Sequence, residues 1–304
     1  MAVSDSLAVP SAETRSLPEW IRIRPPTGTR YDGVKQILGG QRLETVCREA
    51  RCPNLPECWS AGTATLMLLG ADCTRHCSFC AVKTHWPRGV VDATEPERVA
   101  QAVRDWGLRY VVLTQVCRDD LADGGASLLS ETVRQIRRQA PATKVELLAG
   151  DLGGDRTALR AVLSEPPEVF AHNLETVRSL SPAVRDPRAG YDRSLEVLAR
   201  AREVGGSRLV LKSSVMLGLG EQDPEVEAAL TDLLASGVDL LTLGQYLRPS
   251  AAHRPVARYI PPAEFESWKE RALELGFAGV ESGPLVRSSY HAEELFDRAA
   301  ARRE

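Results

Sequence analysis

Six of the seven cysteines in this 304-residue chain fall into two groups of three. They are Cys47, Cys52 and Cys58, spaced CxxxxCxxxxxC, and Cys73, Cys77 and Cys80, spaced CxxxCxxC. Structural zinc and an ordinary four-iron cluster each take four protein ligands, so a group of three leaves one metal position for another ligand. The two triplets therefore predict two clusters, each with an open position at which chemistry takes place.

The charge and the N-terminal sequence exclude several classes of function. The net charge is -3, which gives no basic excess for binding nucleic acid. No apolar run approaches the length of a membrane span, and the N-terminus lacks the basic and apolar parts of a secretory signal. An odd cysteine count in such a chain favours reduced thiols that bind metal over disulfides. We therefore expect a cytoplasmic protein with no nucleic-acid partner and no membrane association.

The hydrophobic pattern divides the chain into four parts. We expect a disordered lead at 1–16, an extended cluster-binding extension at 17–62, a barrel at 63–285 and a C-terminal tail at 286–304. Strand-length apolar runs alternate with helical patterns in the third part, which is typical of a parallel sheet with right-handed crossovers. The predicted fold is α/β, a partial (β/α)6 TIM-like barrel between the N-terminal extension and a C-terminal segment. The expected strands are 65–69, 110–114, 145–148, 169–172, 209–216 and 239–242.

The second triplet follows the first expected strand of the barrel. The carboxyl ends of barrel strands form the catalytic rim, so Cys73, Cys77 and Cys80 are expected there. Phe79 lies between two of these cysteines and is expected to shield one side of the cluster or to stack on an aromatic ring. Two alternatives stay open, a zinc knuckle and a plain redox pair formed by Cys77 and Cys80. Zinc requires a fourth ligand, which the spacing does not provide.

A CxxxCxxC motif after the first strand of a partial barrel resembles the radical S-adenosylmethionine superfamily. The segments TVCREARCPNLPECWSAGTATLMLLG and RSSYHAEEL narrow the resemblance to lipoyl synthases, over about residues 18–295. The resemblance implies S-adenosylmethionine and two 4Fe-4S clusters as cofactors. It also implies that Ser289 of the RSSY motif is the fourth ligand of the upstream, auxiliary cluster. Because Arg287 lies beside that ligand, we hypothesise that it takes part in releasing the cluster iron. An alkoxide is a poor ligand for iron beside thiolates, which suits a cluster that is consumed.

The resemblance also implies which residues contact the cofactor. The segment 119–125 would bind the methionyl amine, although its aspartates could equally cap a helix. Glycines after a strand would allow close backbone approach, or would simply form a turn. The expected cofactor contacts are Phe79, Asn173, Glu175, Lys212, Ser214, Gly218 and Gly220.

The implied reaction is the insertion of two sulfur atoms at C6 and C8 of a protein-bound octanoyl-lysine. The implied substrates are lipoyl carrier domains of 2-oxoacid dehydrogenases or the glycine cleavage H protein. A ferredoxin- or flavodoxin-type electron donor and a carrier that rebuilds the auxiliary cluster are further expected partners. One alternative is a radical enzyme whose upstream cluster only relays electrons. Another is an iron–sulfur electron-transfer or iron-sensing protein without cofactor cleavage.

One departure from the family pattern lies near the expected rim. The chain has Gln115, Val116 and Cys117 where we expect Ser-Val-Asp before RDDL. Cys117 is either a small, partly buried thiol without a role or an altered contact to the cofactor or the substrate.

Overall fold

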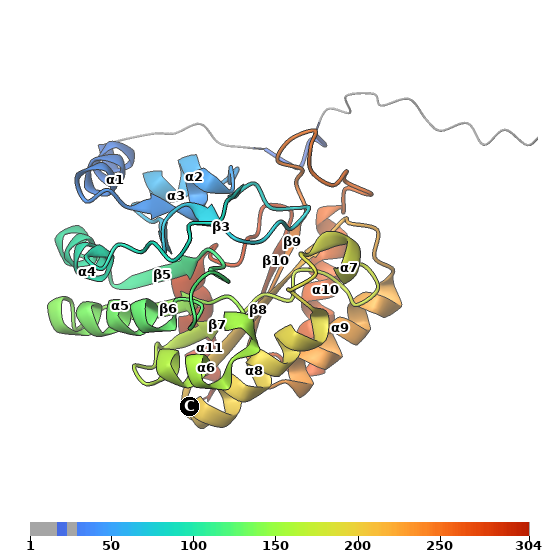
Figure 1. Ribbon diagram of the computed structural model, residues 1–304. Helices are drawn as coiled ribbons and strands as arrows, with labels where there is room; N and C mark the ends of the chain where they lie inside the picture. Colours follow the sequence, from blue (N-terminus) through green and yellow to red (C-terminus); the bar gives the residue numbers. More distant parts are fainter. Residues whose placement is uncertain (1–16, 23–28, 304) are drawn as a thin grey trace, which may run out of the picture.

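The computed structural model describes residues 17–22 and 29–303 and shows one curved sheet surrounded by helices (Figure 1). The expected lead at 1–16 lies outside the described residues. The sheet order is β1-β2-β5-β6-β7-β8-β9-β10, and all neighbours are parallel except β1 with β2. The strands are β1 (Glu44–Thr45), β2 (Thr65–Leu68), β5 (Tyr110–Gln115), β6 (Lys144–Leu148), β7 (Val169–Ala171), β8 (Val210–Leu217), β9 (Leu240–Gln245) and β10 (Gly279–Gly283).

The predicted α/β partial-barrel class is confirmed, and each expected strand forms. Strands β2 and β9 are buried at every position, and β5 at all but its last, as expected for parallel strands covered on both faces. The structure adds β10, which the sequence did not predict because GVESG has neither an apolar run nor clean alternation. A small separate sheet pairs β3 (Asp72–Cys73) with β4 (Lys83–Thr84).

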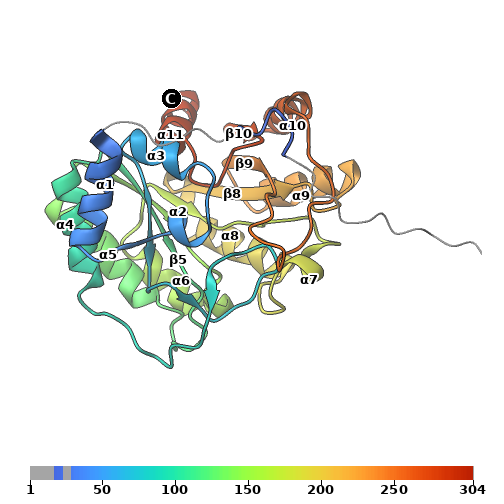
Figure 2. The same cartoon turned by 90° about the horizontal axis from the view of Figure 1, so that it is seen from above.

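Most of the helices lie around the outside of the curved sheet (Figure 2). The last helix packs against residues at the amino ends of β7, β8 and β9. The ring of Phe296 in that helix contacts the ring of Tyr110 in β5 in a tilted arrangement, and Leu295 packs against the first residues of β8 and β9. The last helix therefore closes the amino ends of the strands. No helix within the described residues is long and apolar enough to cross a membrane. The helices are α1 (Thr29–Gly40), α2 (Val46–Glu49), α3 (Leu55–Ser60), α4 (Glu95–Trp106), α5 (Ala126–Gln139), α6 (Arg156–Leu163), α7 (Ser181–Val184), α8 (Tyr191–Gly205), α9 (Asp223–Ala235), α10 (Pro262–Leu275) and α11 (Ala292–Arg303).

The N-terminal extension is more helical than the sequence suggested. We expected an extended segment, but α1, α2 and α3 lie within it. Trp59 of α3 is buried and its ring lies 5.4 Å from that of Tyr31 in α1. This packing supports the loops of the first cysteine triplet from the side of α1.

A charged pair lies inside the barrel, below the rim. Lys212 of β8 donates from Nζ to both carboxylate oxygens of Glu146 of β6, at 2.8 and 3.0 Å, and both side chains are 1% exposed. Tyr110 donates to the same carboxylate at 2.7 Å, and its pKa is raised by burial and then by the charge of Glu146. Because side chains alternate along a strand, Lys212 and Ser214 share the inner face of β8.

We expect Lys212→Met to lower the free energy of unfolding by about 3–5 kcal/mol, because it leaves the Glu146 carboxylate buried without a cation. The measurement is urea unfolding followed by circular dichroism. Adding Glu146→Gln to that variant removes the unpaired charge and is expected to restore most of the loss. Equal losses in the single and the double variant would contradict this account of the pair.

Candidate functional site

A cavity of about 740 Å³ opens at the carboxyl ends of the strands, and both cysteine triplets line it. Its volume lies within the range usual for ligand and cofactor pockets. Twelve of the fifteen residues singled out in the sequence line this one cavity. They are Cys47, Cys52, Cys58, Cys73, Cys77, Phe79, Cys80, Asn173, Glu175, Ser214, Arg287 and Ser289.

The first triplet lies on α2, on α3 and on the turn between them. The backbone N–H of Cys52 donates to the carbonyl of Cys47 at 3.0 Å, which closes the turn. Burial, followed by the charges of Cys47 and Cys52, raises the pKa of the Cys58 thiol to about 12. Burial also raises the pKa of Cys47. Three thiols that influence one another form a compact donor set that a bound cation would stabilise as thiolates.

The C-terminal segment is tied to the first triplet by long-range hydrogen bonds. Thr65 Oγ1 donates to Ser289 Oγ at 2.8 Å, and Tyr290 donates to Glu57 of α3 at 3.0 Å. Gly244 of β9 makes room for the segment, because a Cβ there would lie 2.1 Å from the carbonyl oxygen of Val286. The fold therefore brings Ser289 into the cavity that Cys47, Cys52 and Cys58 line, although more than 220 residues separate it from Thr65.

Arg287 lines the same part of the cavity. One of its guanidinium nitrogens donates to the carbonyl of Val286 at 2.6 Å. Burial lowers the pKa of Arg287, and the neighbouring Cys52 opposes that shift. A cation therefore faces the first triplet from the RSSY motif.

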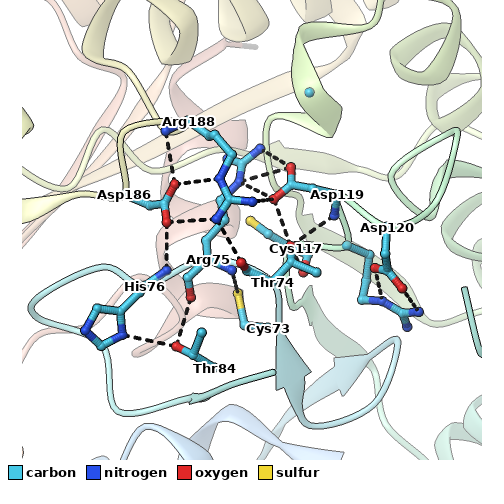
Figure 3. A network of polar contacts seen from close by, with 12 residues as sticks. Cys73, Thr74, Arg75, His76, Thr84, Cys117, Asp119, Asp120, Asp186 and Arg188 are labelled. Carbon is cyan, nitrogen blue, oxygen red and sulfur yellow. Dashed lines mark hydrogen bonds and ion pairs between the residues drawn. The ribbon is translucent and has the colours of Figure 1, made fainter. Parts of the chain in front are cut away.

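The second triplet begins on β3, beyond the end of β2, and its loop is extensively hydrogen-bonded (Figure 3). Burial raises the pKa of Cys77, and it raises that of Cys80 to about 12. The backbone N–H of Asp186 donates to Cys77 Sγ at 3.3 Å, and the N–H of Arg75 to Cys73 Sγ at 3.5 Å. Donors on the sulfurs are typical of iron–sulfur sites, where they tune the cluster.

Cys117 contacts the second triplet. A hydrogen bond from the Cys117 thiol lowers the pKa of Cys73 to about 6, and the same contact raises the pKa of Cys117. Both sulfurs line the cavity. The seventh cysteine is therefore a neighbour of an expected ligand, which its position in the sequence alone did not reveal.

Two of the expected cofactor contacts lie together after β7. Asn173 Nδ2 donates to Glu175 Oε1 at 3.1 Å, and burial raises the pKa of Glu175. The backbone of Glu175 has a φ of 71°, in the left-handed region that non-glycine residues rarely adopt. Such strain is found where the surroundings fix a residue for function.

Three expected cofactor contacts are absent from the cavity wall that the described residues form. Lys212 lies deeper in the barrel, paired with Glu146, so its ammonium is already engaged. A Cβ at Gly218 would lie 2.2 Å from Gln245 Nε2 and 2.4 Å from the carbonyl of Arg258. The close approach at Gly218 therefore serves the packing of this turn against the end of β9 and the backbone of Arg258. Gly220 also has a positive φ, of 113°, on the same turn.

The aspartates of segment 119–125 are bound within the protein. Asp119 accepts from Arg75 at 2.7 Å and from Thr74 at 2.8 Å. Asp120 accepts from Arg118 at 2.7 Å and from the backbone of Gly89 at 2.7 Å. Both carboxylates already have cationic partners, which leaves little capacity for a methionyl amine.

Sequence reasoning missed a polar chain in the cavity wall, to which Arg185 and His172 contribute. Arg185 NH1 donates to Ser194 Oγ at 2.8 Å, so the Ser194 hydroxyl proton is directed to His172 Nε2 at 2.9 Å. The Nδ1–H of His172 then donates to the carbonyl of Ala149 at 2.9 Å. Burial, followed by the charge of Arg185, lowers the pKa of His172 to about 4. This arrangement holds the imidazole neutral.

A neutral buried histidine predicts acid destabilisation. The unfolded chain binds a proton at His172 below about pH 6.5, whereas the folded protein does so only near pH 4. The stabilisation is therefore complete above pH 6.5 and is lost as the pH falls toward 4. We expect about 2 kcal/mol less unfolding free energy at pH 5 than at pH 7 from this group, measured by urea titration. His172→Gln should reduce this pH dependence, whereas replacing the exposed His85 should leave it unchanged.

The donor sets fit clusters with several irons. Within the described residues, no three His, Cys, Asp or Glu side chains are grouped closely enough to hold a single metal ion. Both triplets combine soft thiolate donors with an apolar, buried surrounding, which suits iron–sulfur ligation.

Comparisons with known families agree with this geometry. A profile of the radical SAM superfamily matches residues 67–233, and one of the N-terminal domain of lipoyl synthase matches residues 2–52. The lipoyl synthase of Thermus thermophilus is 54% identical over 97% of this chain and 91% of its own length. That of Symbiobacterium thermophilum is 54% identical over 96% of this chain and 90% of its own length. The chain belongs to the lipoyl synthase family. Members of this family use S-adenosylmethionine and two 4Fe-4S clusters, as the two triplets predict.

Solved structures support the fold of this lipoyl synthase family member. The maturase HydG from Carboxydothermus hydrogenoformans superposes with a TM-score of 0.57 and 15% identity. The superposition covers 88% of this chain and 69% of the HydG chain. Methylornithine synthase superposes with a TM-score of 0.51 and 13% identity, over 75% of this chain and 63% of its own. At these identities the likeness shows the shared barrel alone.

Proposed function

We propose that the two triplets divide a lipoyl synthase reaction between two clusters in one cavity. Cys73, Cys77 and Cys80 hold the cluster that binds S-adenosylmethionine. The auxiliary cluster is held by Cys47, Cys52, Cys58 and Ser289. When bound, the first cluster supplies the electron that cleaves S-adenosylmethionine to a deoxyadenosyl radical, and the auxiliary cluster is the co-substrate that provides sulfur. The observation that carries this proposal is the single cavity lined by both triplets and Ser289.

Residues of the cavity wall have polar atoms available for the cofactor. Asn173 Oδ1 and Arg185 Nε are buried without a hydrogen-bond partner within the described residues. A buried polar atom left unpaired is costly, so a bound group that pairs it gains affinity. We assign Asn173 to the amine or ribose hydroxyls of the cofactor and Arg185 to its carboxylate. Glu175, Ser214 and Phe79 complete this wall.

Ser289 and Arg287 suit a cluster that is consumed. A serine oxygen holds iron more weakly than a thiolate does, so the iron bound by Ser289 dissociates first. Thr65 orients the Ser289 hydroxyl through its 2.8 Å hydrogen bond. Arg287 places a positive charge beside Cys52, where it stabilises a thiolate and assists the departure of iron cations.

The substrate is a lipoyl carrier protein that bears an octanoyl group on a lysine. Apolar cavity residues such as Met67, Val112 and Leu148 offer a surface for the acyl chain. Within this class, we propose lipoyl domains of 2-oxoacid dehydrogenases or the glycine cleavage H protein. We further propose an electron donor of the ferredoxin or flavodoxin type, a carrier that rebuilds the auxiliary cluster, and a cytoplasmic location.

The test is anaerobic turnover of an octanoyl-lysyl peptide with S-adenosylmethionine and a strong reductant, read by mass spectrometry. The proposal predicts a peptide that carries two added sulfur atoms, together with deoxyadenosine. Deoxyadenosine with an unchanged peptide and intact auxiliary sulfide would instead support an electron-relay role for the first triplet. If cluster-loaded protein formed neither product, the proposed reaction would be wrong.

A further inference from the structure

Charged side chains from three neighbouring loops hold the loop of the second triplet (Figure 3). Arg75 lies between Cys73 and Cys77 in sequence, and its side chain is 4% exposed. It binds Asp119 after β5 and Asp151 after β6, each at 2.7 Å. We call the following set the charged clamp: Arg75, Asp119, Asp151, Asp186 and Arg188.

Arg188 joins the parts of the charged clamp to the cysteine loop. It donates to both carboxylate oxygens of Asp186, at 2.8 and 3.0 Å. It also donates to the carbonyl of Thr74, the residue after Cys73, at 2.8 Å, and pairs with Asp119 at 3.1 Å. One planar guanidinium therefore fixes the position of Asp186 relative to the start of the loop.

Asp186 in turn contacts the middle of the loop through both its side chain and its backbone. Its carboxylate accepts the backbone N–H of His76 at 2.9 Å, and its own N–H donates to Cys77 Sγ at 3.3 Å. Arg188 and His76 hold the Asp186 carboxylate from two sides, next to the N–H that reaches Cys77. Arg188 itself is absent from the cavity wall formed by the described residues, so it acts through Asp186.

We propose that Arg188 is a positioning residue for the cluster held by Cys73, Cys77 and Cys80, an inference that rests on that ligand assignment. By keeping the Asp186 N–H directed at Cys77 Sγ, Arg188 raises the reduction potential of the cluster. A donor on a ligand sulfur stabilises the reduced cluster, which carries more negative charge. Partners behind metal ligands commonly tune metal sites in this way.

The test compares Arg188→Gln and Arg188→Lys in the full-length, cluster-loaded protein. Redox titrations are followed by electron paramagnetic resonance, and the signal that changes on addition of S-adenosylmethionine identifies the relevant cluster. For Arg188→Gln we expect the reduced-to-oxidised ratio at a fixed potential to fall about tenfold, equivalent to about 59 mV for one electron. Arg188→Lys keeps the positive charge but loses the planar guanidinium with its paired N–H donors, so it should also lower the reduction potential of the cluster.

Two further measurements separate positioning from charge. In metal-free protein, backbone hydrogen exchange of the segment 74–78 should become faster in both variants, because the His76 N–H loses its fixed acceptor. Arg178→Gln is the matched control, since Arg178 pairs with Asp192 on the exposed surface. It should change neither the potential nor the exchange.

The outcomes distinguish this inference from the ligand assignment. Lower potentials and faster exchange in both Arg188 variants would support it. The positioning role would be overturned if Arg188→Gln left the potential unchanged, or if Arg188→Lys kept both the potential and the exchange rate of the unmodified protein. The cluster assignment would stand in either case. If the unmodified protein gave no signal that responds to S-adenosylmethionine, the ligand assignment itself would fail and this inference with it.

Discussion

Replacing Cys80 by serine is expected to abolish the formation of deoxyadenosine. The variant removes one of three thiolates from a site that has no spare protein ligand in the CxxxCxxC motif. Residues that only support a metal ligand contribute up to about a hundredfold to activity. Because Cys80 is itself a ligand, we expect the rate of deoxyadenosine formation to fall by more than about a hundredfold. The measurement is anaerobic deoxyadenosine formation, with iron content determined on the same sample.

Cys58→Ser provides the matched control for this experiment. It makes the same chemical change in the first triplet, so it should keep deoxyadenosine formation and lose sulfur insertion. Deoxyadenosine formation by Cys80→Ser at the rate of the unmodified protein would contradict the assignment of the second triplet. Loss of deoxyadenosine in both variants would mean that the two triplets do not act separately.

Ser289→Ala is expected to separate cofactor cleavage from sulfur insertion. The variant removes the oxygen that Thr65 orients in the cavity beside the first triplet, while the second triplet is unchanged. We expect sulfur insertion to fall by about 10–100-fold and deoxyadenosine formation to persist. The two products are measured in the same anaerobic reaction by mass spectrometry.

The neighbouring serine tests the specificity of this assignment. Ser288→Ala changes the same motif one residue earlier and should leave sulfur insertion near its original level. Ser289→Cys offers a stronger iron ligand, so the auxiliary cluster should be retained while sulfur insertion slows. Undiminished sulfur insertion in Ser289→Ala would contradict the assignment of Ser289 as a ligand of the auxiliary cluster.

The cysteine spacing was the strongest signal in the sequence, because ligand number limits the possible chemistry. Apolar runs located six parallel strands to within a few residues. The strand β10 and the helices of the N-terminal extension were not predicted, because GVESG and the cysteine-rich region show little hydrophobic periodicity. These elements form through tertiary pairing and packing, which a local pattern does not record.

Side-chain partners were the least predictable part of the site. Lys212 follows the expected inner-face alternation, but only the structure shows that Glu146 engages it. The segment 119–125 was expected to bind the methionyl amine or to cap a helix, and the structure adds that the carboxylate of Asp119 pairs with Arg75 and Arg188. Contacts of this kind join loops that follow different strands, so they depend on the register of the sheet and on loop conformation.

The most direct test of the central claim is to follow the sulfur atoms themselves. Clusters are assembled with heavy-isotope sulfide, free sulfide is removed, and one turnover on an octanoyl-lysyl peptide is analysed by mass spectrometry. If the first triplet and Ser289 hold the sulfur donor, the product carries two heavy sulfur atoms, and Cys58→Ser gives none. A product with unlabelled sulfur, or a labelled product from Cys58→Ser, would contradict the account.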